Sequence, residues 1–135
     1  MKTLEIEAKA ENLDQVTAFI GDALSVHGFE PATVSKTKIA GEEIFINICN
    51  YAYTPDSGFV QIRSAQAGNS IQIEFQDHGR PFNPLSADCS EKSTEKNTKS
   101  LELTEGGYGI LMICNLVSEI SYRFEDGKNI LTIII

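Results

Sequence analysis

Residues 70–82 read Ser-Ile-Gln-Ile-Glu-Phe-Gln-Asp-His-Gly-Arg-Pro-Phe, an alternating segment that runs into an Asp-x-Gly turn. Its apolar residues point one way and its Gln and Glu residues the other, which predicts a strand with one covered face and one wet face. Asp77 at the end of a strand, followed by Gly79 where a ring can approach the backbone, can accept a hydrogen bond from an exocyclic amine. Taken alone, these residues also fit an ordinary Asp-x-Gly turn.

The hydrophobic period predicts further elements on both sides of this strand. Strand spacing covers residues 3–8, 59–65, 70–76, 119–124 and 129–135, and helical spacing covers residues 13–27, 31–53 and 106–117. This order separates the helices from a mostly antiparallel sheet. We therefore expect an α+β fold, a two-layer α/β sandwich with helices on one face of the sheet.

Size and charge restrict the class of protein. The chain has 135 residues, and its 11 Lys plus Arg against 19 Asp plus Glu give a formal charge of −8. A single domain over residues 1–135 is expected. The acidic balance weighs against a direct nucleic-acid partner. No apolar run approaches the ~20 residues of a membrane span, and the acidic N-terminus is unlike a signal peptide. Three widely spaced cysteines indicate free thiols, so a cytoplasmic location without membrane contact is expected.

A carboxylate and an amide share one face of the second predicted helix. Glu43, Asn47 and Asn50 or Tyr51 are spaced i, i+4 and i+7 or i+8. A carboxylate one turn from a carboxamide can hold a water or hydroxyl while the amide oxygen binds Mg²⁺, which prefers oxygen ligands. The alternative is a solvated polar stripe on an amphipathic helix.

A polar segment and a run of glycines precede the last predicted helix. Residues 84–105 are rich in Ser, Thr, Lys and Glu without a period, which predicts a mobile loop of the kind that often forms a lid. The segment Gly106-Gly107-Tyr108-Gly109 follows it. Glycines at a helix N-terminus let phosphate oxygens reach backbone N–H groups. The alternative for an isolated glycine-rich segment is a flexible hinge.

Together and in this order, the three motifs resemble the ATP-binding (Bergerat-type) fold of the gyrase, heat-shock chaperone, histidine kinase and mismatch-repair (GHKL) superfamily. The similarity is strongest to the anti-sigma-factor serine kinase branch. The segment from Asn47 to Tyr53 is similar to that branch's Asn-x-x-x-His-Ala-Tyr, with Tyr51 in place of His. Residues 106–122 match its second glycine box and the following strand. The resemblance covers essentially the whole chain.

The resemblance implies roles for individual residues. Glu43 would be the general base and Asn47 the Mg²⁺ ligand. Asp77 would accept a hydrogen bond from the adenine amine, with Gly79 giving clearance beneath the ring and Thr132 supporting Asp77 through a hydroxyl or a water. The other residues implied to contact the nucleotide are Tyr51, Phe82, Gly106, Gly107, Tyr108 and Gly109.

The resemblance further implies an ATP- and Mg²⁺-dependent serine/threonine protein kinase. In that branch the kinase binds a sigma factor, phosphorylates an anti-anti-sigma antagonist protein, and commonly forms a homodimer. Two alternatives stay open. One is an ATP-binding regulatory interaction module without kinase activity, and the other is the catalytic domain of a histidine kinase.

Overall fold

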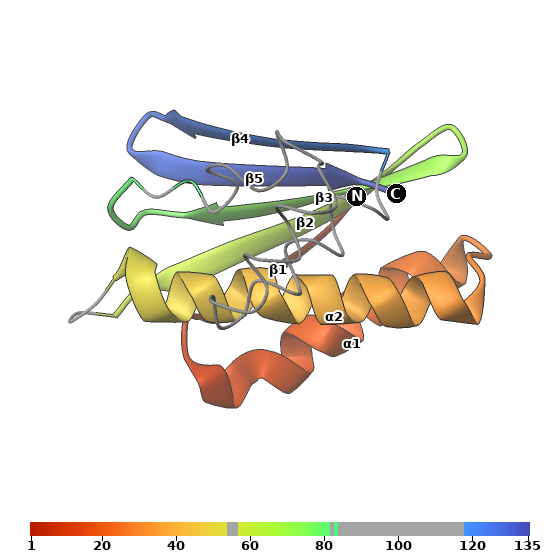
Figure 1. Cartoon of the computed structure of the whole chain (residues 1–135), viewed down its shortest axis with the longest axis horizontal. Coiled ribbons are helices and arrows are strands. Elements are labelled where there is room, and N and C mark those ends of the chain that lie inside the picture. Colours follow the sequence, from red (N-terminus) through yellow and green to blue (C-terminus); the bar gives the residue numbers. More distant parts are fainter. Residues whose placement is uncertain (54–56, 82, 84–117) are drawn as a thin grey trace, which may run out of the picture.

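The computed structural model describes residues 1–53, 57–81, 83 and 118–135, which form two helical elements against one sheet (Figure 1). The elements are β1 (Lys2–Glu7), a 3₁₀ turn η1 (Ala10–Asn12), α1 (Leu13–Val26), α2 (Pro31–Asn47), a π-helical segment η2 (Ile48–Ala52), β2 (Phe59–Ala67), β3 (Ser70–Asp77), β4 (Glu119–Glu125) and β5 (Lys128–Ile134). The predicted α+β two-layer sandwich is confirmed. None of the helices in the described part of the chain is long and apolar enough to cross a bilayer.

The five strands form one antiparallel sheet in the order β1-β2-β3-β5-β4. Hairpins join β2 to β3 and β4 to β5. The second hairpin turns at Asp126 and Gly127, whose φ angles of 53° and 75° match the right-handed twist of the flanking strands. Because β5 inserts beside β3, residues far apart in sequence become neighbours, and Asp77 pairs with Asn129. The central strand of the sheet therefore ends next to the start of β5.

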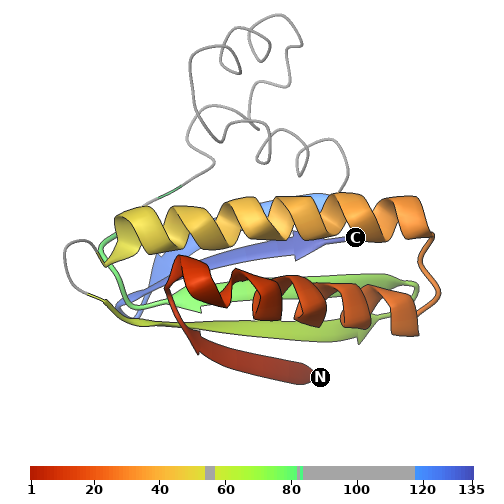
Figure 2. The same cartoon turned by 90° about the horizontal axis from the view of Figure 1, so that it is seen from below.

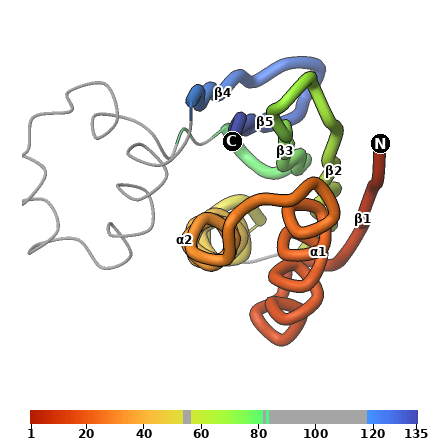
Figure 3. Tube along the Cα trace, turned by 90° about the vertical axis from the view of Figure 1, so that its right-hand side faces the viewer, coloured from red at the N-terminus to blue at the C-terminus, as the bar shows by residue number. Residues whose placement is uncertain are grey.

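Both helices cover the same face of the sheet. Figures 2 and 3 show α1 under the side that carries β1 and β2, and α2 under the side that carries β5. The core between the layers contains fully buried side chains from both helices and from β2, β3 and β5, including Ile20, Phe45, Ile62, Ile73 and Ile133. Burial of this apolar area is the main force that holds the helices on the sheet.

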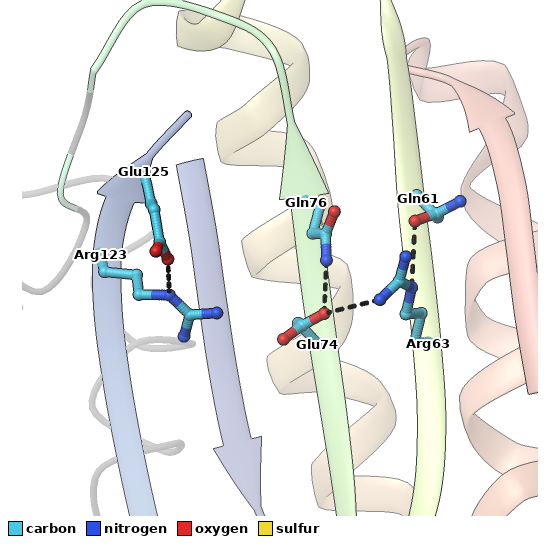
Figure 4. Close-up of polar contacts among 6 residues, drawn as sticks. All are labelled: Gln61, Arg63, Glu74, Gln76, Arg123 and Glu125. Carbon is cyan, nitrogen blue, oxygen red and sulfur yellow. Dashed lines mark hydrogen bonds and ion pairs between the residues drawn. The ribbon is translucent and has the colours of Figure 1, made fainter. Parts of the chain in front are cut away.

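The opposite face of the sheet is polar, as the alternation predicts (Figure 4). Glu74 on β3 accepts a hydrogen bond from Gln76 and lies 3.8 Å from an Arg63 guanidinium nitrogen on β2. Arg123 pairs with Glu125 along β4 at 2.8 Å. The Arg123–Glu125 pair is exposed on both sides and adds little stability.

The second helix differs from the prediction at its end. The sequence predicts one helix from Pro31 to about Tyr53, whereas α-helical geometry ends at Asn47 and a π-helical turn continues to Ala52. A π turn is wider than an α turn, so the i, i+4, i+7 face expected for Asn50 and Tyr51 does not continue past Asn47.

Candidate nucleotide-binding site

A pocket that is partly open to solvent lies where the end of α2 and η2 meets β3, β5 and β4. Its lining is mostly apolar and includes Ile44, Ile48, Ala52, Phe75 and Leu131. The polar side chains that reach it are Asn47, Asp77, Tyr122 and Asn129. An apolar pocket with a few converging polar groups is typical of a small-molecule site.

Asp77 presents only one of its carboxylate oxygens to this pocket. The residue is 4% exposed. Its Oδ1 accepts hydrogen bonds from the backbone N–H of Gly79 and from Nδ2 of Asn129, both at 2.9 Å. No described residue donates to Oδ2, and no fully buried side-chain nitrogen or oxygen in the described part of the chain lacks a partner. Oδ2 is therefore the accessible acceptor of Asp77 in the pocket.

Burial controls the ionisation of Asp77. Desolvation raises the pKa of its carboxyl above the ordinary value, while the hydrogen bonds from Asn129 and Gly79 and the neighbouring His78 oppose that rise. Both hydrogen bonds favour the carboxylate form because they deliver N–H donors to Oδ1. Asp77 is thus a buried acceptor that two donors hold in one orientation.

Asn129 is the residue that the sequence analysis missed. It is 5% exposed at the start of β5. Its Nδ2 also donates to the backbone oxygen of Arg80 at 2.8 Å, and its Oδ1 accepts a short hydrogen bond from the Tyr122 hydroxyl. One signal was available, since Asn129 occupies the apolar face of the alternating segment that continues with Leu131 and Ile133. A polar residue at a core position needs a partner, and the partner becomes visible only with the β3–β5 register.

Thr132 does not take the predicted role beside Asp77. On β5 the residues Asn129, Leu131 and Ile133 face the helices, so Thr132 points to the opposite face of the sheet. It pairs with Glu74, three register positions from the Asp77–Asn129 pair. The prediction placed the supporting residue on the correct strand but on the wrong face, and Asn129 supports Asp77 instead.

Gly79 is required by packing against η2. A Cβ at this position would lie 2.3 Å from the backbone oxygen of Ala52 and 2.6 Å from its carbonyl carbon. This close contact between two backbone segments gives a reason for glycine that the sequence did not reveal, while clearance beneath a ligand ring stays a prediction. That contact is reinforced by Arg80, whose backbone N–H donates to the Ala52 oxygen and whose Nε donates to the Tyr51 oxygen, both at 3.0 Å.

These contacts satisfy the last carbonyls of η2. The last carbonyls of a helix have no intrahelical donor, and Arg80 supplies two donors to them. Tyr53 adds a second bridge, because its hydroxyl donates to the Phe59 oxygen at 2.8 Å and accepts from the His78 N–H at 2.7 Å. The end of η2, the start of β2 and the turn after Asp77 are thereby joined.

The remaining predicted residues fall into two groups. Asn47 lines the pocket, and Glu43 lies one turn before it on α2, partly buried, with the pKa of its carboxyl raised by desolvation. Tyr51 is 51% exposed and does not line the described pocket. Other predictions fall outside the described residues. They are the lid (about residues 84–105), the last helix and five nucleotide contacts, namely Phe82, Gly106, Gly107, Tyr108 and Gly109.

Comparison with known proteins identifies the family. A model of the histidine kinase-like ATPase domain matches residues 6–135. The chain belongs to this family. Among curated proteins, it is 25% identical over 129 residues to the serine-protein kinase RsbW of Staphylococcus aureus, covering 94% of this chain and 81% of the relative. RsbW of Staphylococcus epidermidis is also 25% identical, over 130 residues, with the same coverage. These matches confirm the predicted resemblance to the serine-kinase branch of the superfamily.

Two solved structures share the fold. A chain in the SiaB–SiaC complex from Pseudomonas aeruginosa superimposes with a TM-score of 0.67 at 13% identity, covering 98% of this chain and 88% of that one. The Erythrobacter litoralis EL346 blue-light-activated histidine kinase matches with a TM-score of 0.57 at 18% identity. It covers 93% of this chain and 41% of that one. These similarities extend the shared architecture to proteins with little sequence in common with this ATPase domain.

Replacement of Gly79 by Ala should lower the free energy of unfolding by roughly 1–3 kcal/mol, since the new methyl group must displace the Ala52 backbone. Gly21→Ala is the matched control. Its Cβ would meet only the flexible end of the Lys38 side chain, which can move away. Urea unfolding of both variants measures the difference. Equal stability of the two variants would show that the turn after Asp77 does not pack on η2 as described.

The buried carboxyl of Asp77 should give the protein a specific pH dependence of stability. Because its pKa is raised on folding, the folded protein binds this proton more tightly than the unfolded chain. The contribution of Asp77 is therefore greatest at low pH and is lost as the pH rises through the raised pKa. Denaturant titrations at a series of pH values give the free energy of unfolding of the wild type and of Asp77→Asn. The difference, wild type minus variant, should fall as the pH rises through the raised pKa of Asp77. A difference that increases with pH would contradict the desolvated environment.

Proposed function

We propose that this ATPase-family protein is an ATP-dependent serine/threonine protein kinase that regulates a protein partner. The observation that carries the proposal is the single accessible oxygen of Asp77 at the floor of an apolar pocket. The similarity to serine-protein kinase RsbW supports the same reaction.

Adenine suits this pocket. Its flat ring can pack against the apolar side chains of Ile44, Ile48 and Leu131, which contribute through burial of apolar surface. Its 6-amino group can donate a hydrogen bond to Oδ2 of Asp77. Guanine carries a carbonyl oxygen at that position, which would face the carboxylate oxygen without a proton between them. The pocket should therefore favour adenine nucleotides.

The oxygen atoms of the pocket side chains are compatible with Mg²⁺ that binds together with a nucleotide. No cluster of three or more His, Cys, Asp or Glu side chains able to hold a metal occurs among residues 1–53, 57–81, 83 and 118–135. Mg²⁺ in kinases is commonly held by one or two protein oxygens together with phosphate oxygens and waters. The Asn47 side-chain oxygen in the pocket is such a ligand. Bound there, the ion would neutralise charge on the phosphates.

Glu43 is proposed as the general base. Its partly buried carboxyl has a raised pKa, which makes its carboxylate a stronger proton acceptor than an exposed one. Glu43 would take the proton of a serine or threonine hydroxyl on the partner as the hydroxyl oxygen bonds to the γ-phosphorus and ADP departs. The position of Glu43 one helical turn before Asn47 places the base next to the proposed phosphate end of the site.

The proposed partners follow the relatives. We propose a sigma factor as the bound target and an anti-anti-sigma antagonist protein as the phosphoryl acceptor, with the protein in the cytoplasm and able to form a homodimer. The SiaB–SiaC complex supports a protein partner, since a chain with this fold is found there with another protein. A second candidate is an ATP-binding interaction module without phosphoryl transfer. It is favoured by one observation, namely that Glu43 does not line the described pocket.

Two substitutions on α2 separate nucleotide binding from phosphoryl transfer. Glu43→Gln keeps the size of the side chain and removes its basicity, so Mg-ATP affinity should be retained while transfer falls by about 10²–10⁴-fold. Asn47→Ala removes the Mg²⁺ ligand and should weaken Mg-ATP binding itself. Calorimetry and single-turnover transfer to a purified antagonist protein measure the two effects.

The matched control for these variants is Glu42→Gln. Glu42 neighbours Glu43 but accepts a hydrogen bond from Thr17 of α1 at 3.1 Å, so its replacement should leave both quantities unchanged. Equal loss of binding in Glu43→Gln and Asn47→Ala would remove Glu43 from the role of base. Wild-type protein that binds Mg-ATP but transfers nothing to an antagonist protein would favour the interaction module.

A further inference from the structure

Asn129 makes contacts that neither the sequence motifs nor the family comparison assigns. It lies on β5 and connects β3, the turn after β3 and β4 through one buried amide. The amide has two N–H donors and one oxygen acceptor. Nδ2 donates to Asp77 Oδ1 at 2.9 Å and to the Arg80 oxygen at 2.8 Å, and Oδ1 accepts from the Tyr122 hydroxyl. All of these groups line the pocket or lie in the turn beside it.

The contacts allow the amide only one orientation. Rotation of the amide by 180° would place Oδ1 of Asn129 against Oδ1 of Asp77 and against the Arg80 carbonyl, so that acceptors would face acceptors. The Tyr122 hydroxyl holds the other end of the amide, because it donates to Asn129 Oδ1. The direction itself is set by the Asp77 and Arg80 acceptors, since a hydroxyl can either donate or accept. Tyr122 and Asn129 therefore form a directed pair whose donor points at Asp77.

The carboxylate of Asp77 depends on this pair for its own orientation. The torsion that turns a carboxylate about its bond to Cβ is broad, and the two oxygens are chemically equivalent. Asn129 and the Gly79 N–H both donate to Oδ1, which leaves Oδ2 directed to the pocket. Without Asn129, a single backbone donor would remain and the carboxylate could rotate.

We infer that Asn129, held by Tyr122, is a positioning residue that fixes the Asp77 carboxylate so that Oδ2 meets the 6-amino group of adenine, and thereby determines the preference of the pocket for a 6-amino purine. This inference rests on the proposed nucleotide-binding function. A site built to accept a hydrogen bond from a ligand discriminates strongly against an analogue that lacks the donor. Discrimination of this kind requires that the acceptor be held in place before the ligand arrives.

A purely structural role for Asn129 predicts a different result. If the amide only connected the Arg80 carbonyl to β5, its removal would loosen the pocket for every nucleotide alike. The 6-amino group separates the two roles, because a ligand without that group gains nothing from an oriented Asp77.

The experiment compares ATP with purine riboside triphosphate, which carries hydrogen in place of the 6-amino group. Affinities of both are measured by calorimetry with Mg²⁺ and without a protein partner. The wild type should prefer ATP by about tenfold or more. In Asn129→Ala, ATP affinity should fall by about tenfold while the affinity for the analogue changes by less than about twofold. Tyr122→Phe should reduce the preference in the same direction by a smaller factor, about twofold to fivefold.

Asn69→Ala is the matched control, because Asn69 is an exposed amide in the β2–β3 turn. The preference of this variant for ATP over the analogue should equal that of the wild type. Equal weakening of both ligands in Asn129→Ala would assign Asn129 a structural role only. If Asn129→Ala does not fold, an unchanged preference in Tyr122→Phe overturns the inference. If the wild type binds neither ligand, both the proposed function and this inference are refuted. If the wild type prefers ATP and both variants keep that preference, only the inference is refuted.

Discussion

The hydrogen bond between Asn129 and Asp77 is the interaction on which the candidate site depends. It joins the end of β3 to the start of β5, and the two residues are 52 positions apart in the sequence. An aspartate buried to this degree loses hydration, and that loss must be offset by donors. The structure supplies them from Asn129 and from the Gly79 backbone, so the carboxylate is stable as an acceptor only when β3, β5 and the following turn are assembled together.

The same turn couples the sheet to the helical layer. Gly79 lies against the Ala52 backbone and Arg80 donates to the last carbonyls of η2. The end of the site proposed to recognise adenine and the helix that carries Glu43 and Asn47 are therefore connected through the Gly79 and Arg80 backbone and through the Arg80 side chain. The group proposed to recognise adenine lies on the sheet, and the groups proposed to act at the phosphates lie on α2. The contacts between the turn after Asp77 and η2 set the distance between them.

Much of the fold could be predicted from local sequence. Period-two alternation predicted β3 and the other strands, and helical spacing predicted α1 and the start of α2. The π turn at η2 was not predicted, and its contacts with Arg80, a residue far along the chain, could not be read from the local sequence. The motifs predicted that Asp77 and Asn47 lie at one site, and both residues line the same pocket. The residue predicted to support Asp77 was Thr132, whereas Asn129 donates the hydrogen bond. A strand pattern shows that residues alternate, and the register with the next strand decides which residue faces Asp77.

The central claim is that an oriented Asp77 selects adenine. The most direct measurement is calorimetry of ATP and GTP binding to the wild type and to Asp77→Asn. The account predicts that wild type binds ATP at least about tenfold more tightly than GTP, and that Asp77→Asn loses roughly 1–3 kcal/mol of ATP binding together with this discrimination. Equal affinity of the wild type for ATP and GTP, or undiminished ATP affinity in Asp77→Asn, would contradict it.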